Sequence, residues 1–386
     1  MILRPARSAG RLVGVDLART IALLGMVATH VLDGHTASGG LTTVQWLAGG
    51  RASALFAVLA GVSLALITGG TTPQAGRDLG RSAAGIAVRA VLIALIGLAL
   101  GGLETGLAII LAYYGVLFLL GLPFLGLRAL PLAMLAGAWL VVAPVVSHLV
   151  RPELPDRLSG SPDFASLGDP GQLLAHLLFT GTYPAVPWLA YLLAGMALGR
   201  TDLRGWRTPL RLAGWGAGLA VMATVVSRLC TADPGIRGAL FPHRVLTHEQ
   251  ALRVLQDSLH GSPPTGGAWQ WLLVVSPHSA TPFDLAQTIG SALVVLGLAL
   301  VLVDVVPRHG KVALALVAGA GAIPLTAYTV HVVTKTEQVW PAEQPDNFGW
   351  YAAIVLGLGA AFALSGRRGP LEAIVGWPGR WLRRSD

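Results

Sequence analysis

The sequence predicts an all-α fold, a polytopic integral membrane protein with about ten transmembrane helices and both termini in the cytoplasm. Three observations lead to this prediction: the composition, a series of long apolar runs, and the side on which the basic residues fall. Hydrophobic residues make up 54% of the 386 residues and charged residues only 12%, and the mean hydropathy is +0.66. A soluble protein carries about 25% charged residues, so the composition argues against a soluble protein.

The apolar runs define the expected helices in order. A helix needs about 20 apolar residues to cross the hydrocarbon core of a bilayer. We identify ten such runs, at 12–32, 51–68, 86–104, 106–126, 130–149, 185–199, 209–229, 284–304, 312–333 and 349–365. The sixth is short and extends toward Leu173, or a re-entrant piece there makes eleven. The chain is expected to form one domain over 1–386, with a basic cytoplasmic tail at 367–386.

The basic residues follow alternate runs, so ten spans place all of them on one side of the membrane. The positive-inside rule makes that side cytoplasmic, as expected for a multi-pass protein of the plasma membrane. These residues are Arg4, Arg7, Arg11, Arg77, Arg81, Arg128, Arg200, Arg204, Arg207, Arg211, Arg308, Lys311, Arg367, Arg368, Arg380, Arg383 and Arg384. They form no dense patch with interleaved aromatic residues, which argues against nucleic-acid binding.

Two long loops, 150–184 and 230–283, are expected on the outer side. The second contains a capping box, Thr247 followed by Gln250, ahead of a short apolar helix pattern. Near its end, Thr281 is placed as the N-cap of the run 284–304, with a proline in the first turn. The outer loops therefore carry ordered local structure.

The first apolar run carries the most informative polar residues. Asp16, Arg19 and His30 all lie within it, and ionisable groups inside a bilayer are functional candidates because they are costly there. Helical spacing puts Arg19 and His30 within about 20° of one face, with Asp16 about 40° away. Asp16 and Arg19 are three residues apart and can pair. Arg19 and His30 are separated by about 16 Å along the axis, enough to bind opposite ends of a long molecule.

Further polar residues are expected at the outer level of His30. His35, in the following loop, suggests a metal site together with Asp33 and His30, but no His-Glu-x-x-His pattern occurs and Cys230 has no cysteine partner, so no metal is expected. Substrate-side candidates are Arg51, His278, Ser279, Tyr328 and His331. Any one of them is equally well an ordinary interfacial hydrogen-bonding residue, whereas three histidine-bearing segments at one depth form a stronger signal.

Several segments resemble the heparan-α-glucosaminide N-acetyltransferase-like membrane family, and most closely its uncharacterised bacterial branch. These are GVDLARTIALLGMVATH (14–30), RASALFAVLAGVSLAL (51–66), TGTYPAVPWLAYLLAGMALGR (180–200), HSATPFDL (278–285) and IPLTAYTVHVV (323–333). The wider membrane acyltransferase group carries an arginine, ten residues and then a histidine on its first span. Arg19 and His30 match that spacing.

The resemblance leaves two histidines as catalytic nominees. In the heparan acetyltransferase the active histidine lies in a His-Ala-Ser-type stretch after the first span. His35-Thr36-Ala37-Ser38 resembles that stretch, although the loop here is shorter. We rank His30 before His35 because its position on the Arg19 face is an independent argument.

The resemblance implies an acyltransferase without a bound cofactor that takes an acyl group, most plausibly acetyl, from cytoplasmic acyl-CoA. The acceptor would be a sugar, amino sugar or glycolipid at the outer face, and the enzyme is compatible with a homodimer. Arg77 and Arg81 would attract the phosphates of the donor. The alternative is a transporter or flippase that uses Asp16, Arg19 and His30 as a proton or substrate path. A non-catalytic scaffold would leave these charges unexplained.

Overall fold

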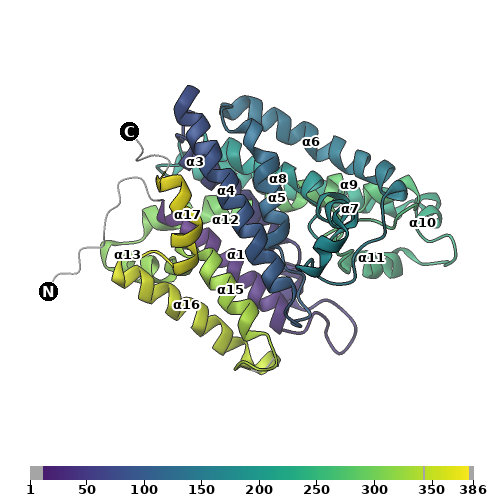
Figure 1. The fold of residues 1–386 in the computed structure, drawn as a ribbon. Helices are drawn as coiled ribbons and strands as arrows, with labels where there is room; N and C mark the ends of the chain where they lie inside the picture. The colour runs from purple at the N-terminus through teal and green to yellow at the C-terminus, as the bar shows by residue number, and fades with distance from the viewer. Residues whose placement is uncertain (1–11, 342–343, 382–386) are drawn as a thin grey trace.

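The computed structural model describes residues 12–341 and 344–381 (Figure 1). These residues form helices joined by loops, and no β-strand occurs among them beyond one isolated bridge between His35 and Leu41. Arg4, Arg7, Arg11, Arg383 and Arg384, which contribute to the predicted charge pattern, lie outside the described residues. The predicted all-helical fold is confirmed for the part of the chain that the structure describes.

The α-helices follow in chain order. They are α1 (Val13–Val31), α2 (Thr43–Ala48), α3 (Arg51–Ile67), α4 (Gly76–Gly101), α5 (Leu111–Gly121), α6 (Ala129–Val150), α7 (Pro170–Ala175), α8 (Ala185–Gly199), α9 (Arg207–Ala232), α10 (Pro234–Leu240), α11 (His248–Gln256), α12 (Pro282–Val305), α13 (Arg308–Val317), α14 (Gly319–Ala322), α15 (Pro324–Thr334), α16 (Phe348–Ser365) and α17 (Pro370–Trp381). A π-helical turn, His176–Thr180, continues α7.

Seven helical segments within the described residues are long and apolar enough to cross a membrane. They contain α1, α2 with α3, α4, α6, α9, α12 and α16. An eighth crossing results if Pro170–Thr180 and Ala185–Gly199, which meet at a bend of 50°, form one broken span. The structure thus supports a polytopic membrane protein, and the helical segment that begins at Pro170, before the short sixth run, is either part of a broken span or a re-entrant piece.

Two predicted spans are not single long helices. The run 312–333 is divided into α13, α14 and α15, because two glycines and Pro324 interrupt it and proline cannot supply the backbone N–H that a continuous helix requires. The run 106–126 contains only α5 and a short 3-10 turn ending at Phe124. The expectation of one continuous helix in each of these two runs is therefore wrong.

Predicted helix ends agree with the structure where a capping side chain fixes them. The Thr247 hydroxyl accepts from the backbone N–H of Gln250, and the reciprocal bond completes the capping box of α11. The Thr281 hydroxyl accepts from the N–H of Asp284 at the start of α12. In contrast, α4 begins at Gly76, ten residues before the predicted run at 86. The apolar run did not include these first turns because they are polar and basic.

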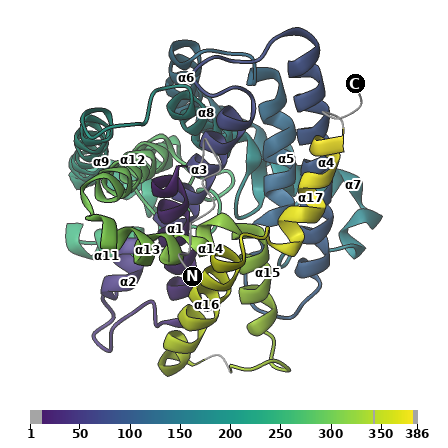
Figure 2. The same ribbon diagram turned by 90° about the vertical axis from the view of Figure 1, so that its left-hand side faces the viewer.

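Helix α1 lies at the centre of the bundle, where it contacts α3, α12 and α14 (Figure 2). Close contact depends on glycine. A Cβ at Gly321 in α14 would overlap the carbonyl oxygen of Asp16, and the α3–α8 crossing likewise leaves no room for a Cβ at Gly61 or Gly195. Small residues that let backbones approach are typical of membrane helix interfaces. They bring the polar residues of α1 next to α3 and α14.

The outward faces of the peripheral helices are apolar. Leu130, Met134 and Leu149 on α6 and Trp215 and Leu229 on α9 are each at least 66% exposed. A soluble monomer rarely presents contiguous apolar surface of this kind, whereas lipid tails cover it in a membrane. Asp16, His331 and Lys335, in contrast, are buried in the interior.

Candidate active site

Two histidines from distant parts of the chain meet at one end of the bundle. His30 lies in the last turn of α1 and His331 in the last turn of α15. The Nδ1 atom of His30 is 3.1 Å from the Nε2 atom of His331, and the rings stack with centroids 5.3 Å apart. One nitrogen of such a contact must donate and the other accept. An N–H of one imidazole therefore donates a hydrogen bond to a ring nitrogen of the other.

Fixed groups surround this pair. The Lys335 ammonium donates to the carbonyl oxygen of His30 at 2.9 Å, so it places a positive charge beside both rings. Tyr351 of α16 packs edge-on against His331 with ring centroids 5.7 Å apart. His331 is only 1% exposed, whereas His30 is partly exposed and its Nε2 makes no hydrogen bond within the described residues. Two ring nitrogens of the pair therefore have no hydrogen bond within the described residues: Nε2 of His30 and the buried Nδ1 of His331.

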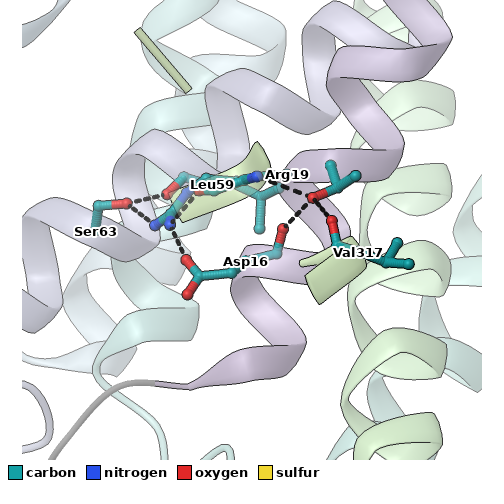
Figure 3. A network of polar contacts seen from close by, with 7 residues as sticks. Asp16, Arg19, Leu59, Ser63 and Val317 are labelled. Atoms are coloured by element: carbon teal, nitrogen blue, oxygen red, sulfur yellow. Dashed lines mark hydrogen bonds and ion pairs between the residues drawn. The ribbon is translucent and has the colours of Figure 1, made fainter. Parts of the chain in front are cut away.

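Asp16 and Arg19 form the predicted ion pair at the other end of α1 (Figure 3). Their oxygen and nitrogen are 2.7 Å apart. The Arg19 guanidinium also donates to the Ser63 hydroxyl of α3 at 2.5 Å and to the carbonyl oxygen of Gly321 at 3.4 Å. Thr20 donates to the carbonyl oxygen of Asp16. Arg19 therefore joins α1 to α3 and α14, a positioning role for the whole central helix.

His278 lies in a loop just before α12 with a left-handed backbone. Its φ is 55° and that of Ala280 is 51°. The Ala280 N–H donates to Asp284, and the His278 ring packs edge-on against Tyr183. Burial and the nearby His260 lower the pKa of His278 to about 4, so this imidazole is neutral near pH 7. Non-glycine residues with positive φ are uncommon and concentrate at functional sites.

A cavity of about 310 Å³ lies beside the centre of the bundle. Arg19 and Tyr328 are in its wall, and His30 is not. Tyr328 is one helical turn before His331, so the cavity ends next to the histidine-bearing turn of α15. The remaining lining residues are mainly apolar side chains of α3, α4, α5 and α15, with Glu372 of α17. The volume falls in the usual range for small-molecule sites.

A comparison with protein families identifies the family of this chain. The catalytic-domain model of heparan-alpha-glucosaminide N-acetyltransferase matches residues 11–229, more than half of the chain. The chain belongs to this family. No curated protein matches it. Membership in the heparan-alpha-glucosaminide N-acetyltransferase family supports membrane-embedded acetyltransferase activity, with acetyl-CoA a plausible co-substrate. His30 and Arg19 lie inside the matched residues, and His331 lies outside them.

His35, the second nominee from the family resemblance, is not joined to the histidine pair. Its Nε2 atom is 2.8 Å from the Asp257 carboxylate, and both side chains are more than half exposed. Together with Asp257 it ties the loop after α1 to the end of α11. Among the described residues, no three histidine, cysteine, aspartate or glutamate side chains gather as a metal site.

The other substrate-side candidates have structural partners. Arg51 donates to the carbonyl oxygen of Trp46 at 2.5 Å and lies over its ring. Ser279 is fully buried and hydrogen-bonded to Thr281. Tyr328 is buried, and its hydroxyl accepts from the N–H of Ile110 at 3.4 Å. Of these residues, only Tyr328 lines the large cavity.

The donor-side arginines lie on α4, but not in the cavity wall. Arg77 is exposed and Arg81 partly exposed in the first turns of that helix, and Arg89, two turns further on, lines the cavity instead. Sequence reasoning missed Arg89, although a cation within the apolar run 86–104 is itself a signal. Glu372 was missed as well, and its position in the basic tail gives no sequence signal.

Proposed function

We propose that this protein moves an acetyl group from cytoplasmic acetyl-CoA to a sugar, amino sugar or glycolipid at the outer face of the plasma membrane. The observation that carries the proposal is the contact between His30 and His331 in a chain of an acetyltransferase family. Thioester acyl transfer needs a base for the acceptor or a nucleophile that carries the acyl group. In this pair, the Nε2 atom of His30, which has no hydrogen bond within the described residues, serves either purpose.

The proposed chemistry follows from the tautomer with a proton on Nδ1 of His30, which donates it to His331. Nε2 of His30 then removes the proton from the acceptor hydroxyl or amine while that oxygen or nitrogen attacks the thioester carbonyl. The new carbon–oxygen or carbon–nitrogen bond forms, the carbon–sulfur bond breaks, and the coenzyme A thiolate takes up the proton. The Lys335 charge beside the pair supports the negative oxygen of the intermediate.

The same geometry serves a two-step route. Nε2 of His30 attacks the thioester, an acetyl-imidazole forms as coenzyme A leaves, and the acceptor then takes the acetyl group. His35 stays the second nominee for this role. The donor is expected to reach the pair from the Arg19 end through the cavity, with Arg77 and Arg81 attracting its phosphates at the cytoplasmic surface. Ten spans, cytoplasmic termini and a homodimer complete the proposed arrangement.

A transporter or flippase is the alternative, and the broken helices favour it to a limited extent. The bend between Pro170–Thr180 and Ala185–Gly199 and the division of α13–α15 resemble the interrupted helices of transporters. However, Arg19 is held by Asp16 and Ser63. A charge fixed in this way supports a scaffold for α1 more than a moving relay.

Purified protein in lipid nanodiscs tests the proposal. Incubation with labelled acetyl-CoA should release free coenzyme A in the presence of amino-sugar or glycolipid acceptors and transfer the label to them. Proteoliposomes that move a solute without any loss of thioester would support the transporter and contradict the acetyltransferase.

A further inference from the structure

The large cavity has one charged end and apolar walls. Phe56, Ile93, Leu111, Phe118 and Leu325 supply much of the apolar surface. Arg19, Arg89 and Glu372 supply its charged groups. A cavity of this form suits an elongated molecule with an anionic group at one end and an uncharged arm.

Arg89 is the cation in this cavity that lacks a hydrogen-bond or ion-pair partner, although the Glu372 carboxylate attracts it at longer range. Its Nε atom is buried without a hydrogen bond, and no ion pair joins Arg89 to another described residue. The other two charges are already satisfied. Arg19 is bound to Asp16 and Ser63, and Glu372 accepts from the N–H groups of Leu325 and Thr326 and from the Thr326 hydroxyl.

An arginine without a hydrogen-bond or ion-pair partner within a membrane span raises the free energy of the folded protein. The second guanidinium nearby, that of Arg19, increases the positive potential around it, and the Glu372 carboxylate offsets a smaller part of that potential. A guanidinium binds phosphate through paired, charge-assisted hydrogen bonds. The charged end of the cavity is therefore complementary to a phosphate group.

Tyrosine hydroxyls supply hydrogen-bond donors along the arm of the cavity. Tyr114 is 3% exposed and its hydroxyl is buried without a partner. The Tyr328 hydroxyl only accepts, from the Ile110 N–H, so its own proton is available. Buried hydroxyls without partners are rare because each costs about 1–3 kcal/mol. Both lie in the wall of the same cavity as Arg89.

We propose that Arg89 binds a phosphate of the acyl-CoA donor and that Tyr114 donates a hydrogen bond to a carbonyl of its pantetheine arm. This inference rests on the proposed function and names the residues that hold the donor. The donor arm then runs past Tyr114 to Tyr328, one turn from His331.

Equilibrium binding in nanodiscs of uncharged lipid tests this assignment, with coenzyme A and with pantetheine, which lacks phosphate. Arg89→Gln should weaken coenzyme A binding about 10-fold or more, because a charge-assisted hydrogen bond is lost, and should leave pantetheine binding unchanged. Arg89→Lys keeps the charge and should recover part of the affinity. Tyr114→Phe should weaken both ligands about 5-fold, as expected for one neutral hydrogen bond.

Two matched variants control for general damage. Arg211→Gln removes an exposed arginine of α9, and Tyr191→Phe removes a buried hydroxyl that binds Thr288 outside the cavity. Neither should change coenzyme A affinity. Thermal unfolding of every variant establishes that it is folded before binding is compared.

The inference is overturned if folded Arg89→Gln binds coenzyme A as tightly as Arg211→Gln, or loses equal affinity for pantetheine. It is also overturned if an anionic phospholipid binds in the cavity and coenzyme A does not. Binding is measured without an acceptor, so its result does not depend on acetyl transfer. A wild-type protein that binds coenzyme A through Arg89 but transfers no acetyl group would retain this site and refute the proposed function.

Discussion

At the scale of single residues, the polar groups of α1 fall into two kinds. Arg19 has protein partners on three sides, Asp16, Ser63 and Gly321, and so holds helices together. His30 has one ring nitrogen engaged by His331 and one left without a hydrogen bond in the described structure. The first pattern is that of a structural residue, and the second supports the catalytic role that we propose for His30.

The ion pair leads to a prediction about stability. Arg19→Ala leaves the Asp16 carboxylate, in a residue 6% exposed, without its guanidinium partner. Loss of one member of a buried pair costs about 3–5 kcal/mol, so thermal unfolding in detergent should shift to clearly lower temperature. Asp16→Ala combined with Arg19→Ala should recover much of the loss, because both charges of the ion pair are then removed.

Ser63→Ala is the matched control for this pair. It removes one hydrogen bond of Arg19 and keeps the ion pair, so it should cost only about 1 kcal/mol. If Arg19→Ala is no less stable than Ser63→Ala, the interpretation of Arg19 as the residue that holds α1 in place is wrong.

At the scale of elements, α17, which follows the last long apolar helix, forms hydrogen bonds that hold part of the bundle. Glu372 of α17 accepts three hydrogen bonds from the first turn of α15, the helix that carries His331. A carboxylate at a helix N-terminus is stabilised by the unpaired N–H groups and by the helix dipole. Helix α17 thereby closes one side of the cavity and fixes the start of α15.

Glu372→Ala should loosen both helices. Loss of these bonds is expected to destabilise the α15 terminus by about 1–3 kcal/mol, seen as faster amide hydrogen exchange at Leu325 and Thr326. Glu337→Gln changes an exposed carboxylate near the other end of α15 and should not alter exchange at these two amides. Unchanged exchange in folded Glu372→Ala would show that α17 does not hold α15.

The sequence predicted helices best where one local signal is sufficient. Long apolar runs define α1, α3, α6, α9, α12 and α16, and capping side chains define the starts of α11 and α12. The division of 312–333 follows from two glycines and Pro324, which a search for apolar runs does not register. The same search gives no signal for the shortness of α5. The ends of α4 were wrong because a membrane helix continues into water through polar turns.

The residues of the candidate site, too, could be predicted only where a local sequence signal is sufficient. Spacing along one helix was enough to place Asp16 next to Arg19. The contact of His30 with His331 joins residues 301 apart in sequence, so only the tertiary fold reveals which of the three histidine-bearing segments meet. The role of Glu372 depends on the return of α17 to α15, for which its basic, tryptophan-containing sequence gives no signal.

At the scale of the whole molecule, the proposed topology separates the two substrates. The His30–His331 pair lies at one end of α1 and the Arg19 end of the cavity at the other. In the proposed function, a donor from one side and an acceptor from the opposite side would meet within this bundle. Acetyl transfer across a membrane requires such an arrangement.

Reporter fusions test this topology. A fusion after Arg204 should report the cytoplasm and one near Pro263 the outside, because the loop arginines set the orientation. These two positions flank α9, one of the long apolar helices. The reverse result at either position would refute the ten-span arrangement.

The rate of acetyl transfer by histidine variants tests the central claim most directly. His30→Ala should lower the rate about 10²–10⁴-fold, as expected for loss of a general base, and His331→Ala should also lower it strongly. His35→Ala and His309→Ala, an exposed histidine of α13, should stay near the wild-type rate. Near-normal transfer by folded His30→Ala, with His35→Ala inactive, would contradict the claim that the histidine pair is the active site.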